Sequence, residues 1–210
     1  MTDIIRTTID DKPTHVALIE QVNLNGCMIR YTCRLNAKAL GREEDLLPTL
    51  HHQVLRYGVG RYCTADRWSG IKRGPIKNCY QNATRLVETD PDRFIYMEGY
   101  GNREDLGIVV GEHAWVLDKE RGYEVIDVTW RDTKGAAYLG IPFRFDYLTN
   151  HTRKHRVYGL LDTPWSRWPI HSLPAEDWLH PDADKIPRDF IVPDDLPDPT
   201  DQLRELRNAG

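Results

Sequence analysis

Residues 107–130 have the sequence GIVVGEHAWVLDKERGYEVIDVTW, and this stretch decides the predicted fold. Two runs rich in β-branched and aromatic residues, 107–117 and 123–130, lie on either side of the polar residues 118–122. Such runs, separated by a short turn that contains glycine, predict an antiparallel β-hairpin.

The length of the turn sets the predicted pairing of the two strands. With Leu117 opposite Tyr123, His113 lies directly opposite Asp127. Opposite residues of an antiparallel pair have Cβ atoms roughly 4.5–5.5 Å apart, which suits a hydrogen bond between an imidazole and a carboxylate. Trp115 lies on the same face, because alternate residues of a strand share a face. A slip of one residue would separate His113 from Asp127, so this expectation depends on the turn.

A helix is predicted over residues 79–89, and Cys79 begins it. Cys79, Ala83 and Val87 recur at the helical period and share one face. Asn78, directly before the helix, belongs to the residue types that cap helix N-termini well. Unpaired N–H groups and the positive end of the helix dipole meet at this first turn, and both stabilise a thiolate.

These three residue types together indicate nucleophilic catalysis. A thiol nucleophile needs a neighbouring base, and the base needs a group that orients it. Cys79, His113 and Asp127 supply one residue for each role. Each also has a simpler explanation: a cysteine packed at a helix start, a histidine hydrogen-bonded on a strand, an aspartate facing solvent. Their joint occurrence with a registered hairpin favours the catalytic interpretation.

The rest of the chain is expected to form one α+β domain over residues 1–161, with its catalytic core at 79–130. Residues 14–35 alternate apolar and polar types around Asn23-Leu24-Asn25-Gly26, which predicts an N-terminal β-hairpin. A helix is predicted over 43–57. Further strands are expected at 93–99 and 157–161.

A proline-rich arm is expected over residues 162–210. Eight of the 13 prolines lie between Pro164 and Pro199, so regular structure should be scarce. Trp165, Trp168 and Trp178 suggest that the first part of the arm packs on the domain. Residues from about 182 onward are acidic and are expected to be extended or mobile, apart from a short helix near 201–208.

Composition and charge narrow the class of protein. A net charge of −4 without a basic stripe disfavours nucleic acid as a partner. The apolar runs are too short to span a membrane, and the first residues do not resemble a secretory signal, so a cytoplasmic protein is expected.

The cysteines and histidines do not predict a metal or another cofactor. The four cysteines, at positions 27, 33, 63 and 79, lack the spacing of a zinc knuckle and are expected to be free thiols. Cys27 and Cys33 are expected to be packed core positions of the N-terminal hairpin. His151 and His155 are four residues apart, but the glutamate of a zinc protease motif is missing.

The chain resembles the transglutaminase-like branch of the papain-like cysteine hydrolases. In that family a cysteine begins a helix, a histidine lies in a strand of the form H-A-W-V, and an aspartate follows in a strand of the form v-D-x-T. The matching stretches are Cys79-Tyr80-Gln81-Asn82-Ala83, His113-Ala114-Trp115-Val116 and Ile126-Asp127-Val128-Thr129-Trp130. The resemblance covers about residues 75–131 and implies a cysteine-bearing helix packed on an antiparallel sheet.

By the same resemblance, the chain is expected to be a cysteine-dependent amide hydrolase or acyltransferase: a protease, amidase, deamidase or transglutaminase-like enzyme. Its substrate would be a peptide, a protein or a small amide. Cys79 would form a thioester, His113 would transfer protons, and Asp127 would hold the imidazole. Asn78, Trp68 and Trp115 are candidates for oxyanion or substrate contacts. Two alternatives stay open: a binding module without turnover, and an arylamine acyltransferase.

Overall fold

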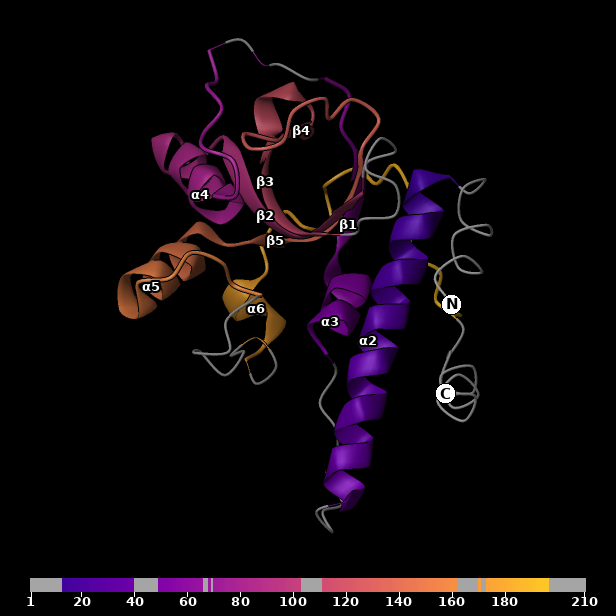
Figure 1. The fold of residues 1–210 in the computed structure, drawn as a ribbon. Helices are drawn as coiled ribbons and strands as arrows, with labels where there is room; N and C mark the ends of the chain where they lie inside the picture. Colours follow the sequence, from indigo (N-terminus) through magenta and orange to yellow (C-terminus); the bar gives the residue numbers. More distant parts are fainter. Residues whose placement is uncertain are drawn as a thin grey trace.

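The computed structural model describes residues 13–39, 49–65, 68, 70–102, 111–161, 170 and 173–196, with the backbone alone for 30–39. Five antiparallel strands form one sheet in the order β1-β5-β2-β3-β4. The strands are β1 (Val59–Tyr62), β2 (Phe94–Asn102), β3 (Gly111–Asp118), β4 (Glu124–Ile126) and β5 (Ala137–Phe143). The sheet curls into a ring in Figure 1, so one face of each strand points into a common core.

The helices lie outside the ring. They are α2 (Thr14–Ala39), α3 (Leu50–Tyr57), α4 (Cys79–Thr89), α5 (Phe145–His155) and α6 (Ala175–Trp178), with a 3-10 turn, η2, at Lys119–Arg121. In Figure 1, α4 lies beside β3, whereas α3 lies below β1 and the long helix α2 runs downward beside β1 and α3. The chain is therefore an α+β protein in which the helix that begins at Cys79 packs against the sheet.

The predicted N-terminal hairpin at residues 14–35 is wrong, because one continuous helix, α2, spans these residues. Its buried residues recur at the helical rather than the strand period: Ala17, Leu18, Ile19, Val22, Asn23 and Gly26. The expected turn at Asn25-Gly26 does not form. A Cβ atom at Gly26 would lie 3.0 Å from the Cβ of His51, so this glycine lets α3 approach α2 closely. The packing of α3 on α2 therefore outweighs the local preference of Asn25-Gly26 for a turn.

The described part of the predicted 43–57 helix begins at Leu50. Thr49 caps it, because its hydroxyl oxygen accepts a hydrogen bond from the N–H of His52 at 3.4 Å. Residues 40–48 lie outside the described part of the chain, and the side chain of Cys33 does too.

The hairpin that decides the fold is present, but its register differs from the predicted one by two residues. Leu117 lies opposite Val125, not opposite Tyr123. The difference arises at the turn, where η2 and two left-handed residues, Gly122 and Tyr123, take up chain that was assigned to the strand. A displacement of two residues leaves every side chain on its predicted face, because the strand period is two. Residues 107–110 of the predicted first strand lie outside the described residues.

Strand β5 was not predicted, although it is an interior strand of the sheet, between β1 and β2. Gly140 and Pro142 interrupt its pattern in the sequence. Pro142 is tolerated because β5 pairs with β1 only over Ala137 to Gly140, so the missing N–H of the proline leaves no ladder bond unmade on that side. The short strand β1 and the helix α5 were not predicted either.

The strand predicted at 157–161 is wrong, because this segment is irregular and is held by a buried carboxylate instead of a ladder. The N–H groups of Leu160 and Leu161 donate to the Glu98 carboxylate at 2.7–2.9 Å. The hydroxyl of Tyr96 donates to the same carboxylate at 2.8 Å. Burial raises the pKa of Glu98 to about 7, although these donors act to lower it.

The described part of the C-terminal arm packs on the domain. Trp178 is buried against Phe143 and Tyr57, as predicted, whereas Trp165 and Trp168 lie outside the described residues. Residues 186–190 are more firmly held than expected. Asp189 N donates to the Gly60 carbonyl at 2.9 Å, and its carboxylate accepts from Tyr62 N at 2.7 Å. The short helix predicted near 201–208 falls outside the described residues.

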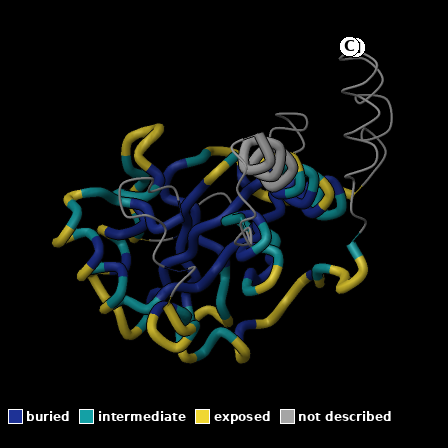
Figure 2. Tube along the Cα trace, turned by 90° about the horizontal axis from the view of Figure 1, so that it is seen from below, coloured by how far each residue is buried: buried dark blue, intermediate teal, exposed yellow. Residues whose placement is uncertain are grey.

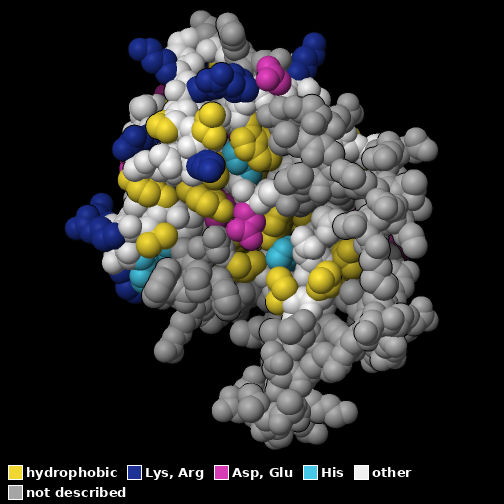
Figure 3. All heavy atoms as spheres, in the orientation of Figure 1, with side chains coloured by type: hydrophobic (Ala, Val, Ile, Leu, Met, Phe, Trp, Pro, Cys, Tyr) yellow, Lys and Arg dark blue, Asp and Glu magenta, His cyan; other side chains and the backbone are white. Residues whose placement is uncertain are grey.

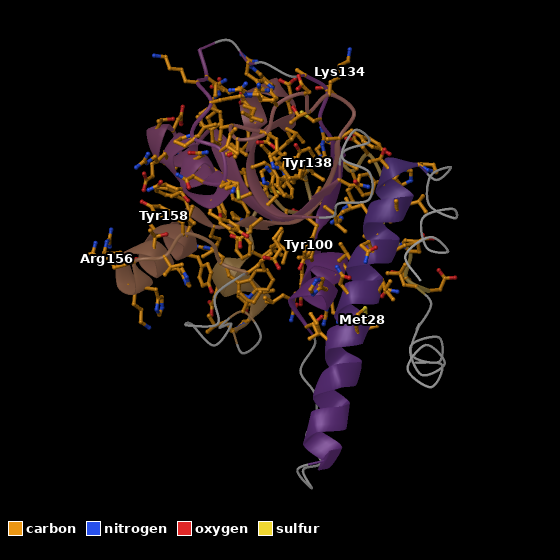
Figure 4. The ribbon with its side chains drawn as sticks, in the orientation of Figure 1. Met28, Tyr100, Lys134, Tyr138, Arg156 and Tyr158 are labelled. Atoms are coloured by element: carbon orange, nitrogen blue, oxygen red, sulfur yellow. The ribbon has the colours of Figure 1, made fainter. Side chains whose placement is uncertain are left out.

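The core is centred on the sheet. Figure 2 places the buried residues on the strands in the middle of the molecule and the exposed residues at its rim. The largest fully buried side chains include Trp115, Tyr138, Leu117 and Ile126, from strands β3, β4 and β5. In Figure 4 the labelled Tyr138 lies inside the ring of strands, whereas Tyr100 points out of it towards α3.

Candidate functional site

Cys79 begins α4 and is nearly buried, with an exposed fraction of 9%. The chain enters the helix through Lys77, whose φ of 70° is left-handed and unusual for a residue other than glycine. Asn78 holds the N-cap position and its carbonyl accepts from Asn82 N, but its side chain makes no cap hydrogen bond. The expected side-chain cap is therefore absent, and Asn78 does not compete for the N–H groups of the first turn.

His113 and Asp127 meet inside the curled sheet. The Nε2 of His113 lies 2.7 Å from Oδ2 of Asp127, and both side chains are buried. Asp127 follows directly after β4, so it approaches His113 from the strand end and not as a ladder partner. The contact was predicted from a register that is wrong by two residues. It forms nevertheless, because His113 and Asp127 remain on one face.

The carboxylate of Asp127 is fully hydrogen-bonded. Oδ1 accepts from the N–H groups of Thr129 and Trp130, each at 2.8 Å, and Oδ2 accepts from the hydroxyl of Tyr138 at 2.7 Å as well as from His113. Burial alone would raise the pKa of Asp127. The charge and hydrogen bond of His113, together with the other donors, outweigh burial and lower this pKa. Asp127 is therefore a fixed negative charge behind the imidazole.

The imidazole of His113 also interacts with Cys79. Burial lowers the pKa of His113, but the carboxylate of Asp127 and the hydrogen bond and charge of Cys79 outweigh it and raise the pKa to about 9. The thiol of Cys79 therefore acts on the same imidazole whose Nε2 is bonded to Asp127. The structure thus brings all three predicted residues together in the order Cys79, His113, Asp127.

Trp130 stacks on the His113 ring. The ring centroids are 3.9 Å apart and the planes are 16° from parallel. Two glycines, Gly101 and Gly111, face one another across β2 and β3 and leave room for this indole. A Cβ atom at Gly101 would lie 2.8 Å from an indole carbon of Trp130. The stacked indole fixes the plane of the imidazole and favours its cationic form.

The three residues predicted to contact the oxyanion or the substrate, Trp115, Trp68 and Asn78, lie in different surroundings. Trp115 is fully buried, lies parallel to His113 at a ring distance of 6.4 Å and packs on Tyr138, so it supports the site from within the core. Trp68 is buried, and its indole N–H has no hydrogen-bond partner in the described part of the chain. The side chain of Asn78 is exposed.

Asn82 joins the two segments that flank the site. Its Nδ2 donates to the carbonyl of Pro75 at 2.8 Å and to the hydroxyl of Thr129 at 2.9 Å. Gly74 N donates to the Val128 carbonyl at 2.8 Å, which ties the same two segments together. A Cβ atom at Gly74 would lie 2.1 Å from Oδ1 of Asn82, so a larger residue here would displace the Asn82 amide.

Sequence reasoning missed Tyr138, Trp130 and Asn82 as site residues. Tyr138 belongs to β5, which was not predicted, so no local signal connects it to Asp127. Trp130 and Asn82 lie within the stretches that carry the family resemblance, and their spacing from Asp127 and Cys79 is the signal that could have identified them.

Comparison of the chain with models of protein families, with curated proteins and with solved structures found no match. The fold is accordingly defined by the structure itself, as an α+β protein with a curled five-stranded antiparallel sheet. Among the residues that the structure describes, no group of three or more His, Cys, Asp or Glu side chains could hold a metal ion. Within the same residues, every helix is too short or too polar to cross a membrane.

Proposed function

We propose that this protein is a cysteine-dependent amide hydrolase or acyltransferase that works through a thioester. One observation carries the proposal: the imidazole of His113 bonds to the buried Asp127 carboxylate, and Cys79, at the first turn of α4, raises the pKa of the same imidazole. A nucleophile, a base and an orienting group thus lie in the order that acyl transfer requires.

In this mechanism the Cys79 sulfur, having given its proton to His113, attacks the carbonyl carbon of the substrate. The carbonyl π electrons move to oxygen, and the backbone N–H of Cys79 at the helix start stabilises that charge. When the oxyanion collapses, the C–N bond breaks and the amine leaves with the proton of the imidazolium. Water or an amine then attacks the thioester and gives a proton back to His113, and the sulfur departs.

The indole N–H of Trp68 is a candidate for the second oxyanion donor, since it is buried and has no partner among the described residues. Asp127 keeps one imidazole tautomer throughout, because its Oδ2 fixes Nε2. Burial of the site keeps bulk water away and strengthens these charge interactions. The free thiols of Cys27, Cys63 and Cys79 agree with a reducing, cytoplasmic setting, which we include in the proposal.

A second candidate function is a binding module that keeps this arrangement without turnover. The observation that favours it is the low exposure of Cys79 and His113, at 9% and 1%. A substrate carbonyl must reach the sulfur, whereas a purely structural cluster need not be reached at all.

Alkylation of the full-length protein with iodoacetamide near neutral pH separates the two candidates. We expect Cys79 to be modified at least about tenfold faster than Cys63, with the modified peptides mapped by mass spectrometry, because only Cys79 faces an imidazolium and a helix N-terminus. His113→Gln should slow the reaction of Cys79 and leave that of Cys63 unchanged. Equal rates at both cysteines, unaffected by His113→Gln, would favour the binding module.

A further inference from the structure

A groove follows the flank of α4 and is separate from the buried cluster around His113. Its volume is about 630 Å³, within the range of roughly 300–1,000 Å³ that ligand pockets occupy. The loop before Cys79 forms one wall and α4 the other, and the start of β2 closes the far end. The lining residues from the helix are Asn82, Arg85, Leu86 and Thr89.

The groove is positively charged. Lys72, Arg85 and Arg93 line it, and the described lining contains no acidic residue. Arg93 is neutralised by Asp118, with Nη2 and Oδ2 2.6 Å apart. Lys72 and Arg85 are exposed and form no ion pair with the described residues. Figure 3 shows Lys and Arg side chains gathered on this upper left part of the molecule, where α4 and the preceding loop lie.

The walls between these charges are apolar. Ile71, Leu86, Phe94 and Val128 line them. Within the loop wall at residues 71–75, Ile71, Gly74 and Pro75 are hydrogen-bonded, whereas the peptide group of Lys72 makes no hydrogen bond within the described part of the chain. Such a segment offers backbone donors and acceptors to an extended chain lying beside it.

The groove begins next to the candidate site. Asn82, which lines it, is one turn beyond Cys79 on α4, and Val128, which also lines it, adjoins Asp127. From Asn82 to Thr89 the helix rises about 10 Å, which matches about three residues of extended chain. A substrate held in the groove would therefore approach the helix start from one side.

We propose that this groove binds an extended acidic segment of a polypeptide substrate. Carboxylates of the segment pair with Lys72 and Arg85, and its aliphatic side chains lie on Leu86 and Phe94. The inference rests on the proposed function of Cys79 and names the class of substrate that it acts on. Two unpaired cations on an apolar floor favour such a segment over a neutral one, because a neutral chain would leave both charges without partners.

The test measures binding to full-length Cys79→Ala protein, so that its outcome does not depend on turnover. The probes are two fluorescein-labelled hexapeptides, one of alternating Leu and Glu and one of alternating Leu and Gln, followed by fluorescence anisotropy. We expect the Glu peptide to bind about tenfold tighter, with affinity falling as salt increases. Lys72→Gln and Arg85→Gln should each weaken the Glu peptide by about fivefold and leave the Gln peptide unchanged.

Arg153→Gln is the matched control, because Arg153 is an exposed cation on α5 away from the groove. It should change neither affinity. Equal binding of both peptides, or equal effects of Arg85→Gln and Arg153→Gln, would overturn the inference. Failure of the proposed function would show elsewhere, as iodoacetamide labelling that does not distinguish Cys79 from Cys63 in the unmutated protein.

Discussion

The start of α4 and the end of β1 each hold a buried cysteine, yet the two thiols have opposite surroundings. Cys63, just beyond β1, points at oxygen acceptors: the carbonyl of Ala65 at 3.1 Å, the hydroxyl of Thr133 at 3.4 Å and the carbonyl of Val125 at 3.8 Å. These partners hold the proton on sulfur. Cys63 is buried, with an exposed fraction of 2%.

Cys79 instead faces the ring of His113 and lies among the N–H groups of the first turn of α4. The imidazolium and these N–H groups both stabilise a negative charge on its sulfur. The two cysteines differ little in exposure, at 9% and 2%. Burial therefore does not distinguish a reactive thiol from an inert one, whereas the sign of the neighbouring charges does.

The largest expected effect comes from exchanging each sulfur for oxygen. Cys79→Ser should lower hydrolysis of p-nitrophenyl acetate by more than about 10⁴-fold, since a hydroxyl is a far weaker nucleophile in this setting. Cys63→Ser should leave the rate within about threefold, because a hydroxyl can donate to the same acceptors. Equal losses of activity in the two variants would contradict the distinction between a reactive Cys79 and an inert Cys63.

Removing the charge behind the imidazole should have the next largest effect. Asp127→Asn is expected to lower the same hydrolysis rate by about 10³–10⁴-fold, because an amide stabilises neither the required tautomer nor the imidazolium. Tyr138→Phe keeps the carboxylate and removes one donor to it, so it should cost about tenfold. A Tyr138→Phe loss as large as that of Asp127→Asn would mean that Asp127 acts only through the packing of the core.

Stability against pH tests the charge state of His113. The folded-state pKa of about 9 lies above the unfolded value near 6.5, so the stabilisation is fully present below pH 6.5 and is lost as the pH rises through 9. The expected loss is about 3 kcal/mol of unfolding free energy, measured by urea unfolding between pH 6.5 and 9.5. The pKa of Glu98 is also raised, from 4.5 to about 7, so its contribution to the unfolding free energy is lost at lower pH, between 4.5 and 7.

The control for this titration is His113→Gln, whose unfolding free energy should change little between pH 7 and 9.5. A wild-type curve as flat as that of the variant would mean that His113 is neutral in the folded protein. Cys79 would then face an uncharged ring.

The smallest expected effect concerns the cap of α4. Asn78→Ala should change the unfolding free energy by less than about 0.5 kcal/mol, because the Asn78 side chain makes no cap hydrogen bond. Thr49→Ala, at the capped start of α3, should cost about 1 kcal/mol and provides the matched control. A loss at Asn78 as large as at Thr49 would show that the first turn of α4 is capped in solution.

The candidate site could be predicted because its signals are local. Cys79 is the first residue of a helical pattern in the sequence. His113 and Asp127 were assigned to one face of the hairpin by the alternation of residues along its strands. A register error of two residues does not change the face on which a strand residue lies. The contact between His113 and Asp127 was therefore predicted correctly, although the pairing of the strands was not.

The parts that could not be predicted depend on contacts between distant segments. Asn25-Gly26 has the composition of a turn, and only the approach of α3 shows why the glycine belongs inside a helix. Gly140 and Pro142 lie in β5, an interior strand whose partners are remote in sequence, and they obscure its strand pattern. The sequence also carries no local sign that Tyr138 donates to Asp127.

The attachment of residues 186–190 to β1 has a consequence for association between molecules. β1 is an outer strand of the sheet, and its unpaired edge would be a template for a strand of another chain. Phe190 forms a bridge with Gly60, and the Arg188 guanidinium donates to the Gly58 carbonyl at 2.6 Å. The arm thus occupies backbone groups that would otherwise recruit a neighbour. Truncation before residue 186 would expose this edge, so the arm protects the fold from edge-to-edge aggregation.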